Sequence, residues 1–212
     1  MKEIFDEDYF ENGIVTGKSC YVNYHWMPEL TIKMANKMIK HLGLKEGDRV
    51  LDFGCAKGFL VRALRILSIN AFGCDISRYA IGKADPEVKH ACKLMKNGTT
   101  IPFGHKFDWI VSKDVLEHIK EKDIDVFLEK AREVADRMFH VIPLADKQGN
   151  LIVPEYELDK THVLKKDFEW WMSKFQSLGW EPVLSTFEVD GIKDNWTSKY
   201  EKGNGFFVLE KR

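Results

Sequence analysis

Residues 50–58 read VLDFGCAKG, an apolar run that contains Asp52 and passes into a turn with Gly54 and Gly58. A short apolar run followed at once by glycine is typical of a strand that is buried in a parallel sheet and leads into a helix. Glycines allow a tight turn and close helix packing, and the free N–H groups at the start of the helix face a ligand. The stretch therefore predicts an α/β fold with a ligand at its first strand-to-helix turn.

Predicted strands and helices alternate on both sides of this stretch. We expect strands at residues 49–54, 70–75, 107–112, 137–143, 182–189 and 205–209. We expect helices at residues 28–42, 60–67, 124–134 and 168–178, with Asp123 as the N-cap of the third. This alternation predicts a mostly parallel sheet with helices on both faces, and the last two strands predict a terminal antiparallel hairpin. The fold class is therefore a doubly wound α/β sheet in three layers.

The composition is that of a single globular domain spanning residues 1–212. The 212 residues are 44% hydrophobic and 31% charged, with 32 basic and 33 acidic side chains and a net charge of -1. This balance does not favour binding to nucleic acid or to an anionic membrane surface. The four cysteines form no CxxC pair, so we expect no disulfide framework and predict no metal site. The charged N-terminus and the lack of a long apolar run favour a cytoplasmic protein.

Two segments fall outside the alternating pattern. Residues 1–45 begin with an unusually aromatic stretch, and residues 144–164 exceed the usual strand-to-helix loop of ~2 to 6 residues. We expect both segments to lie over the carboxyl ends of the strands, where open α/β sheets bind ligands. The N-terminal segment is either a lid that brings Tyr21 onto the ligand or an arm that packs its aromatic side chains on the sheet edge.

Asp75 closes the second predicted strand, 23 residues after Asp52. A carboxylate at this position can accept hydrogen bonds from both hydroxyls of a ribose. The alternative is a surface aspartate that caps a helix starting near Ser77. The glycine turn, the spacing and the strand together favour ribose binding.

Three blocks of the sequence resemble one enzyme family. They are VLDFGCAKG at residues 50–58, GCDIS at residues 73–77 and FDWIVSKDVLEHI at residues 107–119. Together they resemble the class I S-adenosylmethionine-dependent methyltransferases, in the branch of small-molecule and sugar-type enzymes. The resemblance implies a Rossmann-like sheet of seven strands, six parallel and one antiparallel, and S-adenosylmethionine as the cofactor.

The resemblance also implies roles for individual positions. The implied cofactor-binding residues are Asp52, Gly54, Cys55, Ala56, Lys57, Gly58, Asp75, Ile76, Asp114 and Val115. The first six hold or line the methionine end of the cofactor, the next two take the ribose and adenine, and the last two border the sulfonium. Two places depart from the family. Ala56 replaces a common glycine, and residues 97–99 replace an acidic residue that often receives the adenine amino group.

Two histidines are candidates for catalysis on the acceptor side. His118 follows the fourth strand of the family pattern and is expected near the sulfonium, although such a histidine can also cap or pack under the next helix. His162 ends the block DKTH at residues 159–162, which resembles substrate-side blocks of this branch, and Asp159 could orient its imidazole. His140 lies inside a predicted strand and is expected to be a satisfied buried residue.

Two motifs that mark other types of methyl acceptor are missing from the chain. The chain has neither an Asn/Asp-Pro-Pro-Tyr/Phe block after the fourth strand nor a Pro-Cys nucleophile, which disfavours amine and cytosine methylation on DNA. We therefore predict O-methylation of a small molecule or of a glycan or nucleotide-sugar. Two alternatives stay open. One is a catalytically silent cofactor-binding partner module, and the other is a NAD-dependent oxidoreductase, although the glycines do not read G-x-G-x-x-G.

Overall fold

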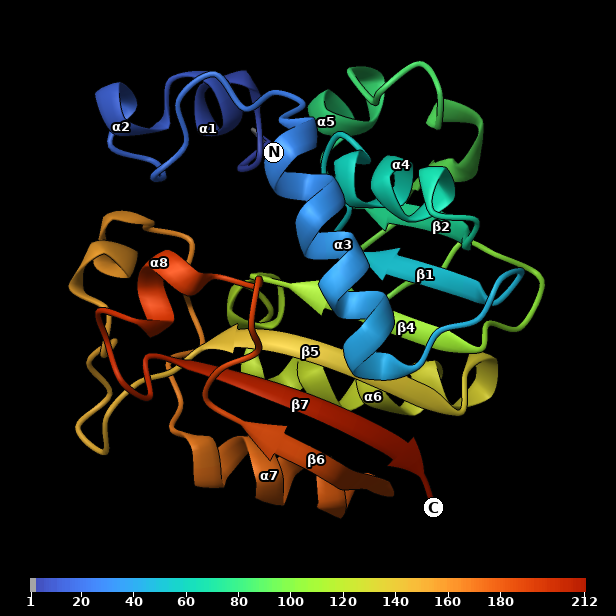
Figure 1. Cartoon of the computed structure of the whole chain (residues 1–212). Coiled ribbons are helices and arrows are strands. Elements are labelled where there is room, and N and C mark those ends of the chain that lie inside the picture. The colour runs from blue at the N-terminus through green and yellow to red at the C-terminus, as the bar shows by residue number, and fades with distance from the viewer. Residues whose placement is uncertain (1–2) are drawn as a thin grey trace.

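The computed structural model describes residues 3–212, and its centre is one seven-stranded sheet (Figure 1). The strand order is β3-β2-β1-β4-β5-β7-β6. Strand β7 runs antiparallel to both β5 and β6, whereas the other neighbouring pairs are parallel. The predicted doubly wound sheet with a terminal antiparallel hairpin is confirmed, and β7 lies between β5 and β6.

All six strands predicted from the sequence are present. The strands are β1 Arg49–Phe53, β2 Asn70–Asp75, β3 Cys92–Leu94, β4 Trp109–Lys113, β5 Arg137–Pro143, β6 Trp180–Thr186 and β7 Asn204–Lys211. Strand β3 was not predicted from the sequence. This strand has three residues and pairs only with β2 at the edge of the sheet, so it carries no periodic pattern.

The helices also follow the predicted order. The α-helices are α1 Glu7–Glu11, α2 Gly13–Thr16, α3 Pro28–Leu42, α4 Phe59–Ile66, α5 Arg78–Gly82, α6 Glu121–Val134, α7 Phe168–Ser177 and α8 Asp194–Thr197. Three 3₁₀ turns are η1 Lys89–Ala91, η2 Leu116–His118 and η3 Pro154–Leu158. The prediction of Asp123 as N-cap is wrong, because α6 begins at Glu121 and Asp123 lies within its first turn. An acidic residue there still interacts favourably with the helix dipole.

Helices cover both faces of the sheet, which confirms the three-layer arrangement (Figure 1). On one face, Met38 of α3 and Leu64 of α4 pack with Val50 in one core cluster. On the other face, Phe127 of α6 and Trp171 of α7 pack in a second cluster that contains Leu51. Neighbouring residues of β1 thus point to opposite faces, as expected for a strand buried on both sides.

Residues 3–27, which we call the N-terminal segment from here on, lie with residues 144–164 at the carboxyl ends of the strands (Figure 1). The expectation for residues 1–45 is therefore met only in part, because α3 packs on one face of the sheet. The hydroxyl of Tyr9 in α1 donates to the Asp159 carboxylate at 2.8 Å. The Lys160 amide donates to the Lys18 carbonyl at 3.3 Å. These contacts join the N-terminal segment to residues 144–164, which we call the excursion. Both therefore form part of the same edge of the molecule.

Candidate active site

A cavity of about 650 Å³ lies at the carboxyl ends of β1, β2 and β4, below the N-terminal segment. Nine of the residues assigned to cofactor binding from the sequence line it. They are Tyr21, Asp52, Gly54, Cys55, Ala56, Asp75, Ile76, Asp114 and Val115. His118 also lines the cavity, whereas Lys57, Gly58 and His162 lie outside its lining.

The turn after β1 depends on two glycines with positive φ. Gly54 has φ +84°, and a Cβ there would collide with the methyl groups of Val115. Gly58 has φ +78° and a Cβ would lie 2.9 Å from the sulfur of Cys92. Ala56, between them, also adopts a left-handed conformation at φ +48°. The turn therefore has the positive φ angles that glycine adopts easily, and Ala56, which carries a Cβ, is locally strained.

Asp75 is part of the cavity wall and is only 8% exposed. Its carboxylate accepts hydrogen bonds from the Ala56 amide at 2.8 Å and from the Ser77 amide at 2.7 Å. Ser77 itself caps α5 by accepting from the Ala80 amide. The alternative of a surface aspartate is therefore wrong, and the carboxylate keeps lone pairs for a further donor.

Asp52 is the second buried carboxyl group of the cavity. Burial, reinforced by the nearby Asp75 carboxylate, raises the pKa of Asp52 to about 7. The Lys113 ammonium opposes this shift without cancelling it. A buried carboxyl group of this kind is stabilised in its charged form by an incoming cation.

Lys57 faces the N-terminal segment. Its ammonium donates to the Glu11 carboxylate at 2.5 Å and to the Tyr24 carbonyl at 2.6 Å. Both partners belong to the segment that covers the cavity. Lys57 therefore connects the glycine turn to that segment.

Asp114 holds a strained position at the end of β4, with φ +56°. It forms ion pairs with Lys113 and with Lys193, which precedes α8. Burial alone would raise the pKa of Asp114, but the two ammonium groups hold it well below its usual range. Lys193 was not anticipated, since nothing in the sequence shows that its loop returns to β4.

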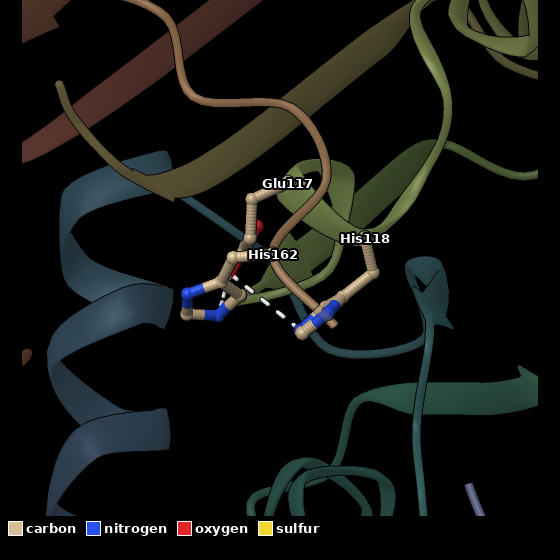
Figure 2. A group of neighbouring side chains, drawn as sticks. All are labelled: Glu117, His118 and His162. Atoms are coloured by element: carbon tan, nitrogen blue, oxygen red, sulfur yellow. Dashed lines mark ion pairs between the residues drawn. The ribbon is translucent and has the colours of Figure 1, made fainter. Parts of the chain in front are cut away.

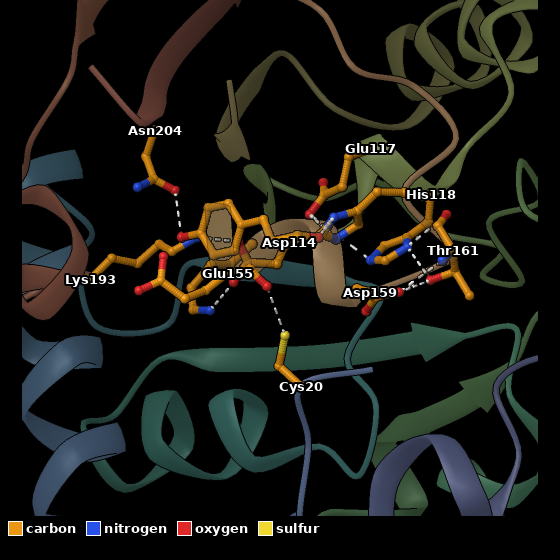
Figure 3. A network of polar contacts seen from close by, with 12 residues as sticks. Cys20, Asp114, Glu117, His118, Glu155, Asp159, Thr161, Lys193 and Asn204 are labelled. Carbon is orange, nitrogen blue, oxygen red and sulfur yellow. Dashed lines mark hydrogen bonds and ion pairs between the residues drawn. The ribbon is translucent and has the colours of Figure 1, made fainter. Parts of the chain in front are cut away.

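His118 is oriented by a chain of hydrogen bonds (Figure 3). Nδ1 of His118 lies 2.8 Å from Oγ1 of Thr161, and that hydroxyl donates to the Asp159 carboxylate at 2.5 Å. Asp159 thus acts on His118 through Thr161. The expectation that Asp159 orients the imidazole of His162 is wrong, because Nδ1 of His162 instead lies 2.9 Å from the Tyr156 carbonyl.

The structure brings Glu117 between the two histidines (Figure 2). Its Oε1 lies 3.9 Å from Nε2 of His118 and 3.9 Å from Nε2 of His162. The centroids of the two imidazole rings are 4.7 Å apart. Burial raises the pKa of Glu117 well above its usual range and lowers the pKa of His118 to about 4. Glu117 lies within the DVLEHI block, but no role was predicted for it from the sequence.

His140 of β5 is fully buried, as predicted. Its Nδ1 lies 2.7 Å from the Ser112 hydroxyl, whereas Nε2 has no hydrogen-bond partner among residues 3–212. Burial lowers the pKa of His140 to about 3. The residue is therefore a neutral core histidine that is only half satisfied.

Comparison with known proteins identifies the family. A family model described as a methyltransferase domain matches residues 25–187, which include the cavity walls from β1, β2 and β4. The chain belongs to this methyltransferase family. It is an enzyme that uses S-adenosylmethionine.

Individual relatives agree with this assignment. The methyltransferase is 34% identical over 100 residues to a ubiquinone biosynthesis O-methyltransferase from Chelativorans sp. (strain BNC1), a match covering 42% of this chain and only 36% of that protein. A SAM-dependent methyltransferase from Archaeoglobus fulgidus has a TM-score of 0.65 at 15% identity, covering 87% of this chain and 95% of that one. The glycopeptide N-methyltransferase MtfA, solved with sinefungin, has a TM-score of 0.62 at 12% identity, covering 86% and 87%. These two structures share the fold.

The cavity suits the cofactor in size and charge. Its volume lies in the range of about 300 to 1,000 Å³ that is common for small-molecule sites. The buried Asp52 and Asp75 carboxyl groups suit a ligand with cationic and hydroxyl groups, both of which S-adenosylmethionine has. Within the described part of the chain, no helix is long and apolar enough to cross a membrane.

Proposed function

We propose that the methyltransferase methylates a hydroxyl oxygen of a small molecule. The observation that carries this proposal is a pair of imidazoles, His118 in the cavity wall and His162 packed against it, with ring centroids 4.7 Å apart. Their Nε2 atoms face Glu117 while their Nδ1 atoms are hydrogen-bonded. A hydroxyl must lose its proton during methyl transfer, and neutral histidines beside the cavity are suited to assist that loss. The O-methyltransferase of Chelativorans supports the same type of acceptor atom.

We assign the cofactor to the cavity in one orientation. Asp75 and Ile76 take the ribose and adenine, and Asp52 with the glycine turn takes the methionine end. Asp114 and Val115 border the sulfonium. The support is that these side chains line one continuous cavity with Cys55 and Ala56. Lys57 and Gly58 would then act indirectly, through the N-terminal segment and the packing of α4.

The N-terminal segment is proposed to be a lid over this cavity. Tyr21 lines the cavity and is in ring contact with Phe10 and Tyr24, at centroid distances of 6.2 and 5.1 Å. An aromatic cover of this kind excludes water from the reacting groups. A cytoplasmic setting is also proposed, on the four cysteines without a CxxC pair and the charged N-terminus of the sequence.

The chain's own contribution to catalysis is alignment and proton removal. Bound S-adenosylmethionine supplies an electrophilic methyl group. The lid and the strand ends restrict the acceptor to one side of the cavity. The acceptor hydroxyl and the methyl group are then held together in one complex, so the reaction no longer depends on a collision between free molecules. His118 and His162 assist removal of the hydroxyl proton on that side.

Labelled methyl transfer tests the proposed function. The enzyme would be incubated with methyl-labelled S-adenosylmethionine and a panel of hydroxyl compounds, each paired with its amine analogue. We expect label in methyl ethers, and we expect the Asp75→Asn variant to be inactive at the same cofactor concentration. Label in the amines alone would contradict the hydroxyl acceptor, and binding of cofactor without transfer to any compound would favour a silent module.

A further inference from the structure

Glu117, His118 and His162 form a compact group of donor atoms, which we call the Glu-His-His cluster (Figure 2). One ligand atom from each residue lies within 4.8 Å of the others, and both Glu117 to histidine distances are 3.9 Å. Donor atoms around a tetrahedral Zn²⁺ lie about 3.3 Å apart, given bonds of about 2.0 to 2.1 Å. Closing the cluster around one ion therefore needs each Glu117 to histidine distance to shorten by about 0.6 Å and no donor pair to approach by more than about 1.5 Å.

Both histidines direct an unprotonated nitrogen into the cluster. Nδ1 of His162 contacts the Tyr156 carbonyl, which can only accept, so the proton lies on Nδ1 and the lone pair on Nε2. Thr161 donates its hydroxyl proton to Asp159, so its oxygen accepts from Nδ1 of His118 (Figure 3). Metal-binding histidines are oriented in this way, by a carbonyl or carboxylate behind the ring.

The Glu117 carboxylate lacks the partners that its burial demands. Its side chain is 0% exposed, and neither carboxylate oxygen has a hydrogen-bond partner among residues 3–212. A buried carboxyl group without partners is costly, so native proteins protonate it, pair it or place it on a metal. The two imidazole nitrogens cannot donate to it in the tautomers described above. A cation between the three groups would satisfy all of them.

The backbone holds the cluster together across two distant segments. The Val163 and Leu164 amides both donate to the Glu117 carbonyl at 3.0 Å. This pairing fixes the end of the excursion against η2 and keeps His162 beside Glu117. The cluster is therefore built by the fold and does not depend on exposed, mobile side chains.

We propose that the Glu-His-His cluster binds one divalent transition-metal ion, represented by Zn²⁺. Two imidazoles and one carboxylate suit Zn²⁺ or Fe²⁺, whereas Mg²⁺ and Ca²⁺ prefer oxygen donors alone. Three protein ligands leave at least one coordination position open. Of the three residues His118 alone lines the cavity, so an acceptor would reach the open position past its ring.

The metal site deepens the proposed function and, in its catalytic part, rests on it. An acceptor hydroxyl bound to the ion loses its proton at a lower pH than a free hydroxyl. The O–H bond breaks, the proton passes to solvent, and the oxygen lone pair forms the bond to the methyl carbon as the carbon–sulfur bond breaks. His118 and His162 would then assist deprotonation as metal ligands.

Metal binding is tested directly on the full chain. The protein would be freed of metal with a chelator, dialysed against Zn²⁺ with excess Mg²⁺, and analysed for bound metal and for thermal unfolding. We expect one Zn²⁺ per chain and a higher unfolding temperature than for the metal-free protein. The Glu117→Gln and His162→Ala variants should bind Zn²⁺ at least about tenfold more weakly. The His90→Ala variant, which removes an exposed histidine, should bind as the wild type does.

Two readouts separate this proposal from the acceptor assignment. If wild type and Glu117→Gln retain equal Zn²⁺, the metal site is refuted, even if the enzyme still methylates hydroxyls. If wild type alone binds Zn²⁺ and no hydroxyl compound is methylated, the metal site stands and the proposed acceptor fails. Affinity for S-adenosylhomocysteine, measured in each variant, should stay within a few-fold of wild type and shows that the variants are folded.

Discussion

At the residue scale, the site depends on charges and conformations that are unfavourable without a ligand. Asp52 is a buried carboxyl group beside a second one, Asp75. Ala56 and Asp114 adopt left-handed backbone conformations that L-residues rarely take. Such features cluster at functional sites because the surrounding structure compensates for their cost.

The raised pKa of Asp52 predicts a pH-dependent affinity for cofactor. In the free enzyme, Asp52 titrates at a pKa of about 7, and a bound methionine ammonium would favour the charged carboxylate. Binding therefore releases a proton, so affinity is full above pH 7 and falls as the pH drops below it. We expect S-adenosylhomocysteine to bind about tenfold more weakly at pH 6 than at pH 8. Titration calorimetry measures this affinity at each pH. The Asp52→Asn variant should bind S-adenosylhomocysteine weakly, with an affinity that does not change between pH 6 and pH 8. An equally steep pH dependence in the variant would refute the assignment to Asp52.

The strain at Ala56 predicts a stabilising substitution. Ala56→Gly removes the Cβ from a residue at φ +48°, while glycine adds entropy to the unfolded chain. We expect the free energy of unfolding in urea to rise by about 0.5 to 1 kcal/mol. Ala80→Gly is the matched control, because Ala80 lies within helix α5 and its replacement should destabilise the protein. A loss of stability in both variants would show that Ala56 is not strained.

At the element scale, the N-terminal segment and the excursion are coupled by a few polar contacts. Tyr9 of α1 donates to Asp159, and Asp159 in turn accepts from Thr161, which orients His118. The order of the N-terminal segment is thus linked to the position of a candidate catalytic group. Both segments were expected over the strand ends from the sequence. The contacts between them could not be predicted, because they join residues far apart in the chain and leave no periodic pattern.

Removing the Tyr9 hydroxyl should loosen the N-terminal segment. Tyr9→Phe leaves a buried carboxylate without one partner, and a hydrogen bond to a charged group contributes about 1.5 to 3 kcal/mol. We expect amide hydrogen exchange in residues 5–24 to accelerate at least about tenfold. Tyr200→Phe, which removes a hydroxyl bonded to Glu155 outside the cavity, is the control and should leave that exchange unchanged. Equal exchange in Tyr9→Phe and wild type would contradict the coupling.

At the scale of the whole molecule, the order and type of most elements could be predicted from the sequence. Buried strands such as Asn70–Asp75 and helices with a clear apolar face were located closely, because burial on a sheet imposes a repeating pattern. The edge strand β3 is too short for such a pattern. The sequence also predicted the cavity walls formed by the glycine turn and by the ends of β2 and β4, because each of these walls comes from one continuous sequence block.

The remaining site residues depend on how distant segments meet. Lys193 reaches Asp114 from the loop before α8, and His162 reaches Glu117 from the excursion. Neither pairing follows from local propensity or spacing. Only the folded chain shows that Glu117, quoted within a cofactor motif, has unpartnered oxygens between two histidines.

The central claim is that S-adenosylmethionine binds with its ribose on Asp75, and ligand-linked thermal stability tests it most directly. At S-adenosylhomocysteine concentrations of about 100 times the dissociation constant, wild type should gain about 2.7 kcal/mol of stability. The Asp75→Asn variant should lose most of this gain at the same concentration, whereas Asp136→Asn, at an exposed carboxylate, should keep it. An equal gain in wild type and Asp75→Asn would contradict the account.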